Sequence, residues 1–185
     1  MSITTNARLA GIAYLAYLAA GIGSMAVRDN PGVTAVAGVA MSFCAVLLGV
    51  TLYAITREQD RDLAILAMIC RVLEAAPGEG EIYFAVGNTI FCWLLLKGRL
   101  IPAALAMLGV AASAALSVLV LLQTGGLFGG RMSWSSPVTW AVWLPVLIFE
   151  LTFAAWLLVK GASVAASVQR LGRTDRSRPA SPSTL

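Results

Sequence analysis

The chain has 185 residues, of which 59% are hydrophobic and only 12% are charged, and its formal net charge is +4. This composition is far more apolar than that of a soluble domain and excludes a water-soluble globular fold. The basic residues are scattered between apolar segments, so we expect an integral membrane protein and no nucleic-acid partner.

Six hydrophobic segments, each bounded by charged or turn residues, follow one another along the chain. We predict membrane-spanning helices at residues 9–27, 33–55, 63–76, 82–96, 101–122 and 138–159. The third and fourth segments give only about 21 to 23 Å of helix each, against a hydrocarbon core of about 30 Å. They form either a short hairpin or one interrupted span. The fold class predicted is an all-α polytopic membrane protein, with a transmembrane domain at residues 1–161.

The distribution of the 13 basic residues favours the hairpin. With six spans, 10 of the 13 share one side with both termini: Arg8, Arg57, Arg61, Lys97, Arg99, Lys160, Arg170, Arg173, Arg176 and Arg178. With one interrupted span, the same residues would divide more evenly between the two sides. We therefore expect six spans in a cytoplasmic (inner) membrane, with both termini cytoplasmic. A cleaved signal peptide is the alternative interpretation of the first segment.

Residues 162–185 lose hydrophobicity and gain Arg, Ser and Pro, which predicts a short helical extension and a basic, disordered cytoplasmic tail. Its arginines would rest on anionic lipid at about 1 kcal/mol each. Cys44, Cys70 and Cys92 lie within predicted spans, at spacings that match no zinc or redox motif, and the chain has no histidine. We expect no disulfide, no metal site and no cofactor.

Polar residues within the spans are the strongest candidates for function, because charge in an apolar segment is costly. Counting about 1.5 Å per residue from the cytoplasmic boundaries puts Arg71, Asn88 and Glu150 roughly 12 to 14 Å deep. Glu74 lies one turn deeper than Arg71 on the same helical face, and Tyr17 falls at a matching height. We predict that these five residues form a polar layer.

This polar layer has two interpretations. As a structural lock, it would neutralise Arg71 with Glu74, Glu150 or both, while Asn88 bonds across a helix interface. As a binding or proton/ion site, it would use the net negative charge that two carboxylates leave beside one arginine, which a proton or cation could balance. The sequence leaves both open.

Three further features are weaker. Pro145, close before Glu150, is expected to kink its helix, although many such kinks only serve packing. Glu79 and Glu81 would form an outer acidic mouth above Glu74, or belong to an ordinary tight turn. Ladders of small residues allow close helix packing or a homo-oligomer: Ala16, Ala20 and Ser24; Gly38 and Ser42; and Gly109, Ser113 and Ser117.

Four stretches together resemble a known family: RLAGIAYL (8–15), RVLEA (71–75), GNTIFCWLLLKGRLIPAALAMLG (87–109) and LPVLIFELTFAAWLLVKG (144–161). They are similar to an uncharacterised bacterial membrane-protein family, domain of unknown function 4386. The resemblance implies a six-helix membrane domain, with the polar residues of the third, fourth and sixth spans and Pro145 at family-like positions. It implies no activity. The early APGEGE turn departs from the family pattern and favours a thinned vestibule over Glu74.

Two classes of function follow. The first is a small transporter or ion-coupled carrier that uses Arg71, Glu74, Asn88 and Glu150. The alternative is a non-catalytic membrane module that binds lipid, a hydrophobic ligand or a partner protein, with the charges as a structural lock. An intramembrane enzyme ranks third, because only acid chemistry by Glu74 or Glu150 would be open to it, so we do not expect catalysis.

Overall fold

A computed structural model of the chain describes residues 3–27, 29–76, 80–129 and 136–176, with side chains as far as Gly161. The regular structure of these residues is helical throughout, which confirms the predicted all-α class. The elements are α1 (Ile3–Ala26), α2 (Pro31–Thr56), α3 (Arg61–Glu74), α4 (Gly80–Lys97), α5 (Ala103–Thr124), the short 3-10 helix η1 (Leu127–Gly129) and α6 (Pro137–Arg176).

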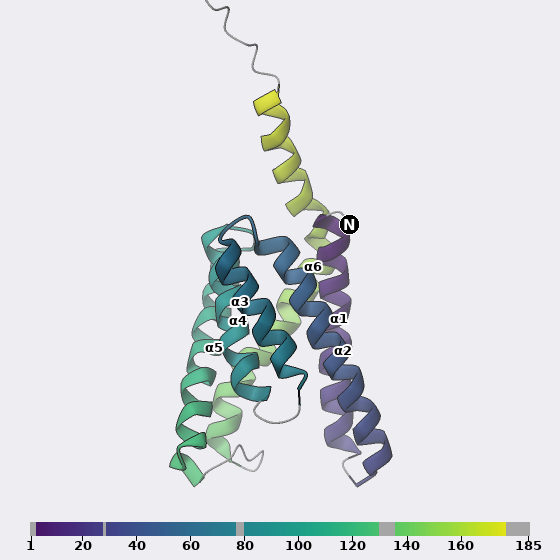
Figure 1. Cartoon of the computed structure of the whole chain (residues 1–185), viewed down its shortest axis with the longest axis vertical. Helices are drawn as coiled ribbons and strands as arrows, with labels where there is room; N and C mark the ends of the chain where they lie inside the picture. The colour runs from purple at the N-terminus through teal and green to yellow at the C-terminus, as the bar shows by residue number, and fades with distance from the viewer. Residues whose placement is uncertain (1–2, 28, 77–79, 130–135, 177–185) are drawn as a thin grey trace, which may run out of the picture.

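The six α-helices form a closed ring. Each helix packs against the next one along the chain, and α6 packs against α1. The start of α1, the links α2–α3 and α4–α5 and the long extension of α6 lie at one end of the bundle, while the α1–α2 link lies at the other (Figure 1). Helices α3 and α4 stop short of that second end, so the ring is shallower on their side.

Four helices are long and apolar enough to cross a membrane: α1, α2, α5 and the Pro137–Gly161 part of α6. Helix α3, with 14 residues, measures about 21 Å, and α4, with 18 residues, about 27 Å. Both are shorter than a hydrocarbon core of about 30 Å. The chain is an integral, multi-pass membrane protein.

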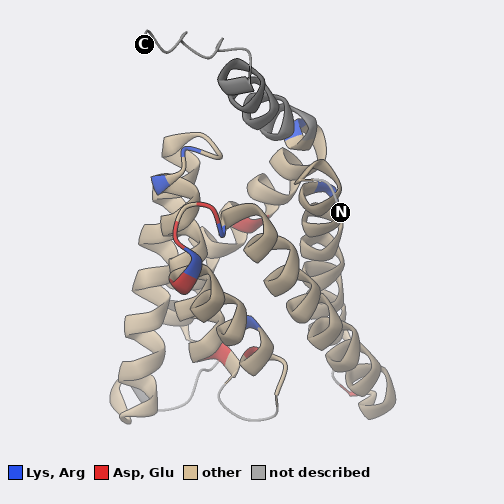
Figure 2. Cartoon of the chain, turned by 45° about the horizontal axis from the view of Figure 1, so that its top comes forward, with Lys and Arg blue, Asp and Glu red and all other residues tan. Residues whose placement is uncertain are grey.

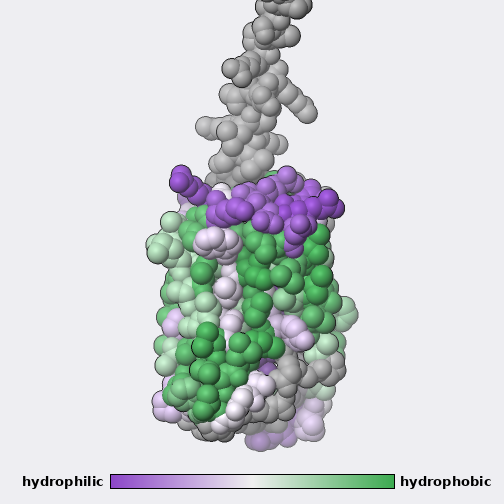
Figure 3. All heavy atoms as spheres, turned by 60° about the vertical axis from the view of Figure 1, so that its left-hand side comes forward, coloured by the Kyte–Doolittle hydropathy of each residue, from purple (hydrophilic) through white to green (hydrophobic). Residues whose placement is uncertain are grey.

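The surface of the bundle fits a bilayer. In Figure 3, a hydrophilic band at one end gives way to a largely hydrophobic wall. Figure 2 shows the charged residues mostly at the end where the N-terminus lies, with few along the helices. Large apolar side chains point outward, among them Phe43 at 72% exposed and Val159 at 76%. In water such a surface would aggregate, whereas in lipid it is the expected exterior.

Local sequence explains where the helices begin and end. Asn30 caps α2 by accepting a hydrogen bond from the backbone N–H of Val33, and Pro31 occupies the first turn. Helix α3 ends at Glu74, close before Pro77, because a proline disfavours helical geometry at the residue before it. This early stop agrees with the short third segment predicted from the sequence.

Helix α6 is the longest element, with 40 residues, and contains Pro145 in its interior. It continues to Arg176, so residues 162–176, in the segment for which a short helical extension before a disordered tail was predicted, are helical. The rest of that segment, residues 177–185, lies outside the described residues. The anionic-lipid contact expected of the tail stays a prediction.

The short helices α3 and α4 pack very closely. A Cβ added at Gly87 of α4 would lie 2.8 Å from the Cβ of Cys70 and 3.2 Å from the carbonyl oxygen of Ala67, both on α3. Of the predicted small-residue ladders, Gly109 and Ser113 are buried, whereas a Cβ at Gly38 of α2 would meet nothing within 4 Å. Glycine is therefore required at position 87 and optional at position 38.

We expect Gly87→Ala to lower the free energy of unfolding by about 1 to 3 kcal/mol, because the added methyl group overpacks the α3–α4 contact. Gly38→Ala, an identical change on an open helix face, should have little effect. Chemical unfolding in detergent measures both. Equal stability of the two variants would contradict the close packing of α3 on α4.

Asp60 caps the start of α3 at the charged end of the bundle, outside the spanning segments. Its carboxylate accepts a hydrogen bond from the backbone N–H of Leu63 at 3.2 Å and pairs with Lys97 at 3.4 Å. The Leu63 hydrogen bond, helped by Lys97, holds the pKa of Asp60 below its ordinary value. The ionised form is therefore favoured in the folded protein.

A depressed pKa means that Asp60 stabilises the fold above the unfolded aspartate pKa of about 3.9, and that this contribution disappears as the pH falls through the folded value. We expect the Tm of the wild type to fall more steeply between about pH 5 and pH 3 than that of Asp60→Asn, because asparagine still caps a helix but does not titrate. Thermal unfolding over this pH range is the measurement. Parallel curves would contradict the role given to Asp60.

Candidate functional site

The centre of the candidate site is Arg71, in the last turn of α3 and 0% exposed. Its Nη1 donates to Oε2 of Glu74 at 2.8 Å, which forms an ion pair between residues three apart on one helix. The helical repeat of 3.6 residues places such a pair on the same face. A buried guanidinium needs a partner of opposite charge, and the final residue of the same helix supplies it.

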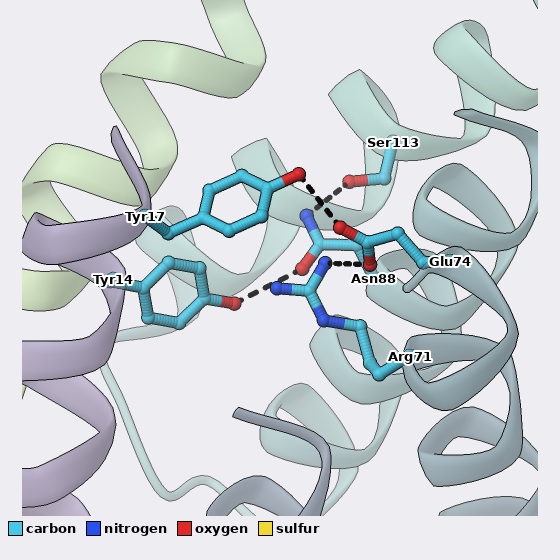
Figure 4. A network of polar contacts seen from close by, with 6 residues as sticks. All are labelled: Tyr14, Tyr17, Arg71, Glu74, Asn88 and Ser113. Carbon is cyan, nitrogen blue, oxygen red and sulfur yellow. Dashed lines mark hydrogen bonds and ion pairs between the residues drawn. The ribbon is translucent and has the colours of Figure 1, made fainter. Parts of the chain in front are cut away.

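Helix α1 contributes the second contact of Glu74. The hydroxyl of Tyr17 donates to Oε1 of Glu74 at 2.7 Å, so both carboxylate oxygens accept a hydrogen bond (Figure 4). The side chain of Glu74 is only 7% exposed. Arg71, Glu74 and Tyr17 thus form a charge-neutral unit that joins α1 to α3, which we call the Arg71 lock.

Aromatic rings surround the rest of the guanidinium. Its Nε and Nη2 have no hydrogen-bond partner, but its Cζ lies 5.1 Å from the ring centre of Phe84, 5.7 Å from that of Tyr17 and 6.0 Å from that of Tyr14. Cation–π attraction at this range is worth about 2 kcal/mol when the groups are desolvated. The rings therefore offset part of the free energy that is lost when the two nitrogens are buried without hydrogen bonds.

Asn88 forms a second polar unit beside the first. The hydroxyl of Tyr14 donates to Oδ1 of Asn88 at 3.2 Å, and Nδ2 of Asn88 donates to Oγ of Ser113 at 3.0 Å (Figure 4). All three side chains are buried. They come from α1, α4 and α5, so these hydrogen bonds cross two helix interfaces, as the lock interpretation expects of Asn88.

Glu150 of α6 stands apart from both units. It is 2% exposed, and its Oε1 has no hydrogen-bond partner within the part of the chain that the structure describes. Among the described residues, the ion pair of Arg71 is with Glu74, and Glu150 forms none. Of the two carboxylates considered as partners of Arg71, the structure therefore selects Glu74.

Glu150 lines a cavity of about 370 Å³ whose walls are otherwise largely apolar. These walls come from α1, α2 and α6: Tyr17, Leu18, Gly21, Ile22, Met25, Met41, Trp140, Trp143, Leu144 and Leu147. Pro145 lies in the same stretch of α6, five residues before Glu150. A buried carboxyl group in an apolar wall is the most unusual chemical feature of this bundle.

A second cavity, of about 270 Å³, is next to the first, since Tyr17, Met41 and Trp143 line both. Glu74, Glu81 and Ser42 belong to its wall. Glu81 is exposed, and Glu79, the other member of the predicted acidic mouth, lies outside the described residues. A cavity therefore lies beside Glu74, where the vestibule was predicted. The water access of this vestibule and its attraction for cations stay predictions.

Tyr14 was not among the predicted site residues, and Ser113 was predicted only as a small packing residue. Tyr14 precedes Tyr17 by three residues, so both fall on one face of α1, and this spacing could have revealed it. Nothing in the apolar sequence of α5 marks Ser113 as the partner of Asn88. Cys44, Cys70 and Cys92 are free thiols. In the part of the chain that the structure describes, no group of three or more His, Cys, Asp or Glu residues could hold a metal ion.

The Arg71 lock predicts a specific coupling. Arg71→Gln and Glu74→Gln should each lower the free energy of unfolding by about 3 to 5 kcal/mol, because each leaves a buried charge without its partner. The double variant should recover part of that loss, with a coupling of about 1 to 3 kcal/mol. The control is Arg71→Gln with Glu150→Gln, which removes a carboxylate that does not pair with Arg71. A larger coupling in the control would contradict the assigned pair.

Comparison with known proteins gives one match. Residues 79–161 match the family model described as Domain of unknown function (DUF4386), and no curated protein or solved structure matches the chain. The matched range contains the stretches 87–109 and 144–161, on which the resemblance partly rests, and includes Asn88, Pro145 and Glu150. Arg71 and Glu74 precede it. The resemblance is thereby confirmed over residues 79–161, which match the model of this domain of unknown function.

Proposed function

We propose that this protein is a membrane-embedded binding module that takes up a small hydrophobic ligand in the cavity beside Glu150. In this proposal six helices cross a cytoplasmic membrane and both termini are cytoplasmic. The placement of 10 of the 13 basic residues supports that orientation. The shared end of the α1 start and the α6 extension is compatible with it (Figure 1).

The observation that carries the proposal is the cavity of about 370 Å³ between α1, α2 and α6. Ligand sites in proteins usually have volumes of about 300 to 1,000 Å³, apolar walls and a few polar groups. Here the walls are aliphatic and aromatic, and Glu150 supplies a polar group.

The cavity also has a route to lipid. Ile22 and Leu144, which belong to its wall, are 57% and 50% exposed on the apolar surface of the bundle. A ligand dissolved in the bilayer could therefore enter sideways between α1 and α6. The Arg71 lock lies next to this path and, in the proposal, holds α1 and α3 in place while the ligand binds.

A carrier is the second candidate function, and one observation favours it. Glu150, buried without an ion-pair partner, lies five residues after Pro145 on the same helix, where the missing backbone N–H weakens the helix locally. A hinge at Pro145 would let Glu150 face either side of the membrane in turn. Proton or substrate flux that Glu150→Gln abolishes would favour the carrier, whereas binding without flux favours the module. A homo-oligomer through the small-residue faces stays a prediction.

Ligand uptake is tested by filling the cavity. Gly21 lies in its wall, and a Cβ there would meet only Met41, at 3.6 Å, an ordinary contact. The probe is a short brominated alkane, which quenches the fluorescence of Trp140 and Trp143 when it occupies the cavity of the protein in lipid nanodiscs. We expect a saturable component of quenching in the wild type and its loss in Gly21→Leu, because the larger side chain occupies the ligand volume.

Gly23→Leu is the matched control, since a Cβ at Gly23 on the same helix meets nothing within 4 Å. This variant should keep the saturable component. Quenching that grows without saturation in the wild type, as simple partition into lipid would give, contradicts the proposed site. Equal loss in both variants would show that the effect is not specific to the cavity and would also count against it.

A further inference from the structure

We infer that the ligand of this cavity is a lipophilic cation, an amphipathic molecule whose ammonium group pairs with Glu150 while its apolar body fills the space between α1 and α6. The inference rests on the proposed binding function and narrows it to a substrate class. It follows from the charges, the aromatic residues and the opening of one cavity.

The charges of the buried residues do not balance. Arg71 is the buried cation, and Glu74 neutralises it at 2.8 Å with both carboxylate oxygens engaged. Glu150, at 2% exposed, is a second acidic group and forms no ion pair within the described residues. In surroundings of low dielectric constant such a group either keeps its proton or needs a cation. A positively charged ligand supplies that cation, whereas an anionic ligand would be repelled.

The aromatic residues of the wall suit an alkylated ammonium group. Tyr17 of α1 lines the same cavity as Glu150, as do Trp143 and Trp140, which lie about 10 and 15 Å before Glu150 along α6. The faces of such rings attract cations, and sites for quaternary ammonium ligands combine several of them. A carboxylate together with aromatic rings is the chemistry that recognises an organic cation, because each ring also packs against its alkyl groups.

The rest of the cavity selects for an apolar body. Leu18, Leu144 and Leu147 offer no hydrogen bond to a polar ligand. A metal ion or a bare inorganic cation would lose most of its hydration here without gaining oxygen ligands, so it is a poor occupant. A molecule with one charged end and a hydrocarbon chain satisfies Glu150 and the leucines at once. Such a molecule also partitions into lipid and reaches the opening beside Leu144 from the side.

The test compares three probes of one size that displace the brominated alkane: octyltrimethylammonium, its uncharged isostere with carbon in place of nitrogen, and octylsulfonate. We expect the ammonium to displace at a concentration about tenfold lower than the isostere, and the sulfonate to be the weakest. In Glu150→Gln the advantage of the ammonium over the isostere should disappear. Glu58→Gln, an equal charge change at an exposed position, should behave as the wild type.

The outcomes separate the two proposals. If the ammonium and the isostere displace equally in the wild type, the cation inference is wrong and the hydrophobic site remains. If no saturable quenching exists at all, both are wrong. An advantage that survives in Glu150→Gln also overturns the inference, since it would come from the rings or from lipid charge. Should that variant not fold, the ranking of the three probes on the wild-type protein decides.

Discussion

The fold of this protein depends on one constraint, which is that the guanidinium of Arg71 is fully buried in a membrane bundle. An unpaired arginine near the centre of a span costs at least about 2.5 to 3.5 kcal/mol, so the surrounding helices must compensate it. Glu74 does so from the same helix, and Tyr17 holds Glu74 from α1. Phe84 of α4 adds an aromatic face. Residues of α1, α3 and α4 thus contact the side chain of Arg71 or its partner Glu74. The hydrogen bond from Asn88 to Ser113 also connects α4 to α5.

The same constraint divides the two carboxylates into different roles. Glu74 is the last residue of α3, and each of its carboxylate oxygens accepts a hydrogen bond, so its role is structural. Oε1 of Glu150 accepts no hydrogen bond from the described residues, and this side chain lines a cavity. The lock and site interpretations of the polar layer are therefore compatible, because they apply to different members of it. Because the Arg71 lock is neutral by itself, Arg71 does not supply an ion-pair partner for Glu150.

Much of this architecture could be predicted from the sequence, because long apolar runs and turn residues mark helices directly. Spacing alone placed Glu74 on the same helical face as Arg71 and made it one of two candidate partners, with Glu150 as the other. The orientation of each helix about its own axis could not be predicted, because segments such as α5 are apolar on every side. That angle decides whether Glu150 faces Arg71 or a cavity. It also decides which hydroxyl group, here that of Ser113, reaches Asn88.

The short α3–α4 hairpin gives the ring unequal thickness, and a bilayer must respond to it. Helix α2, with 26 residues, measures about 39 Å, whereas its neighbour α3 measures about 21 Å. With six spans, lipid would not match both lengths around one circumference, so we expect a thinner membrane beside the hairpin than beside α1 and α2. Such hydrophobic mismatch costs a fraction of a kcal/mol per Å. This difference in hydrophobic length would favour thin or curved regions of the membrane.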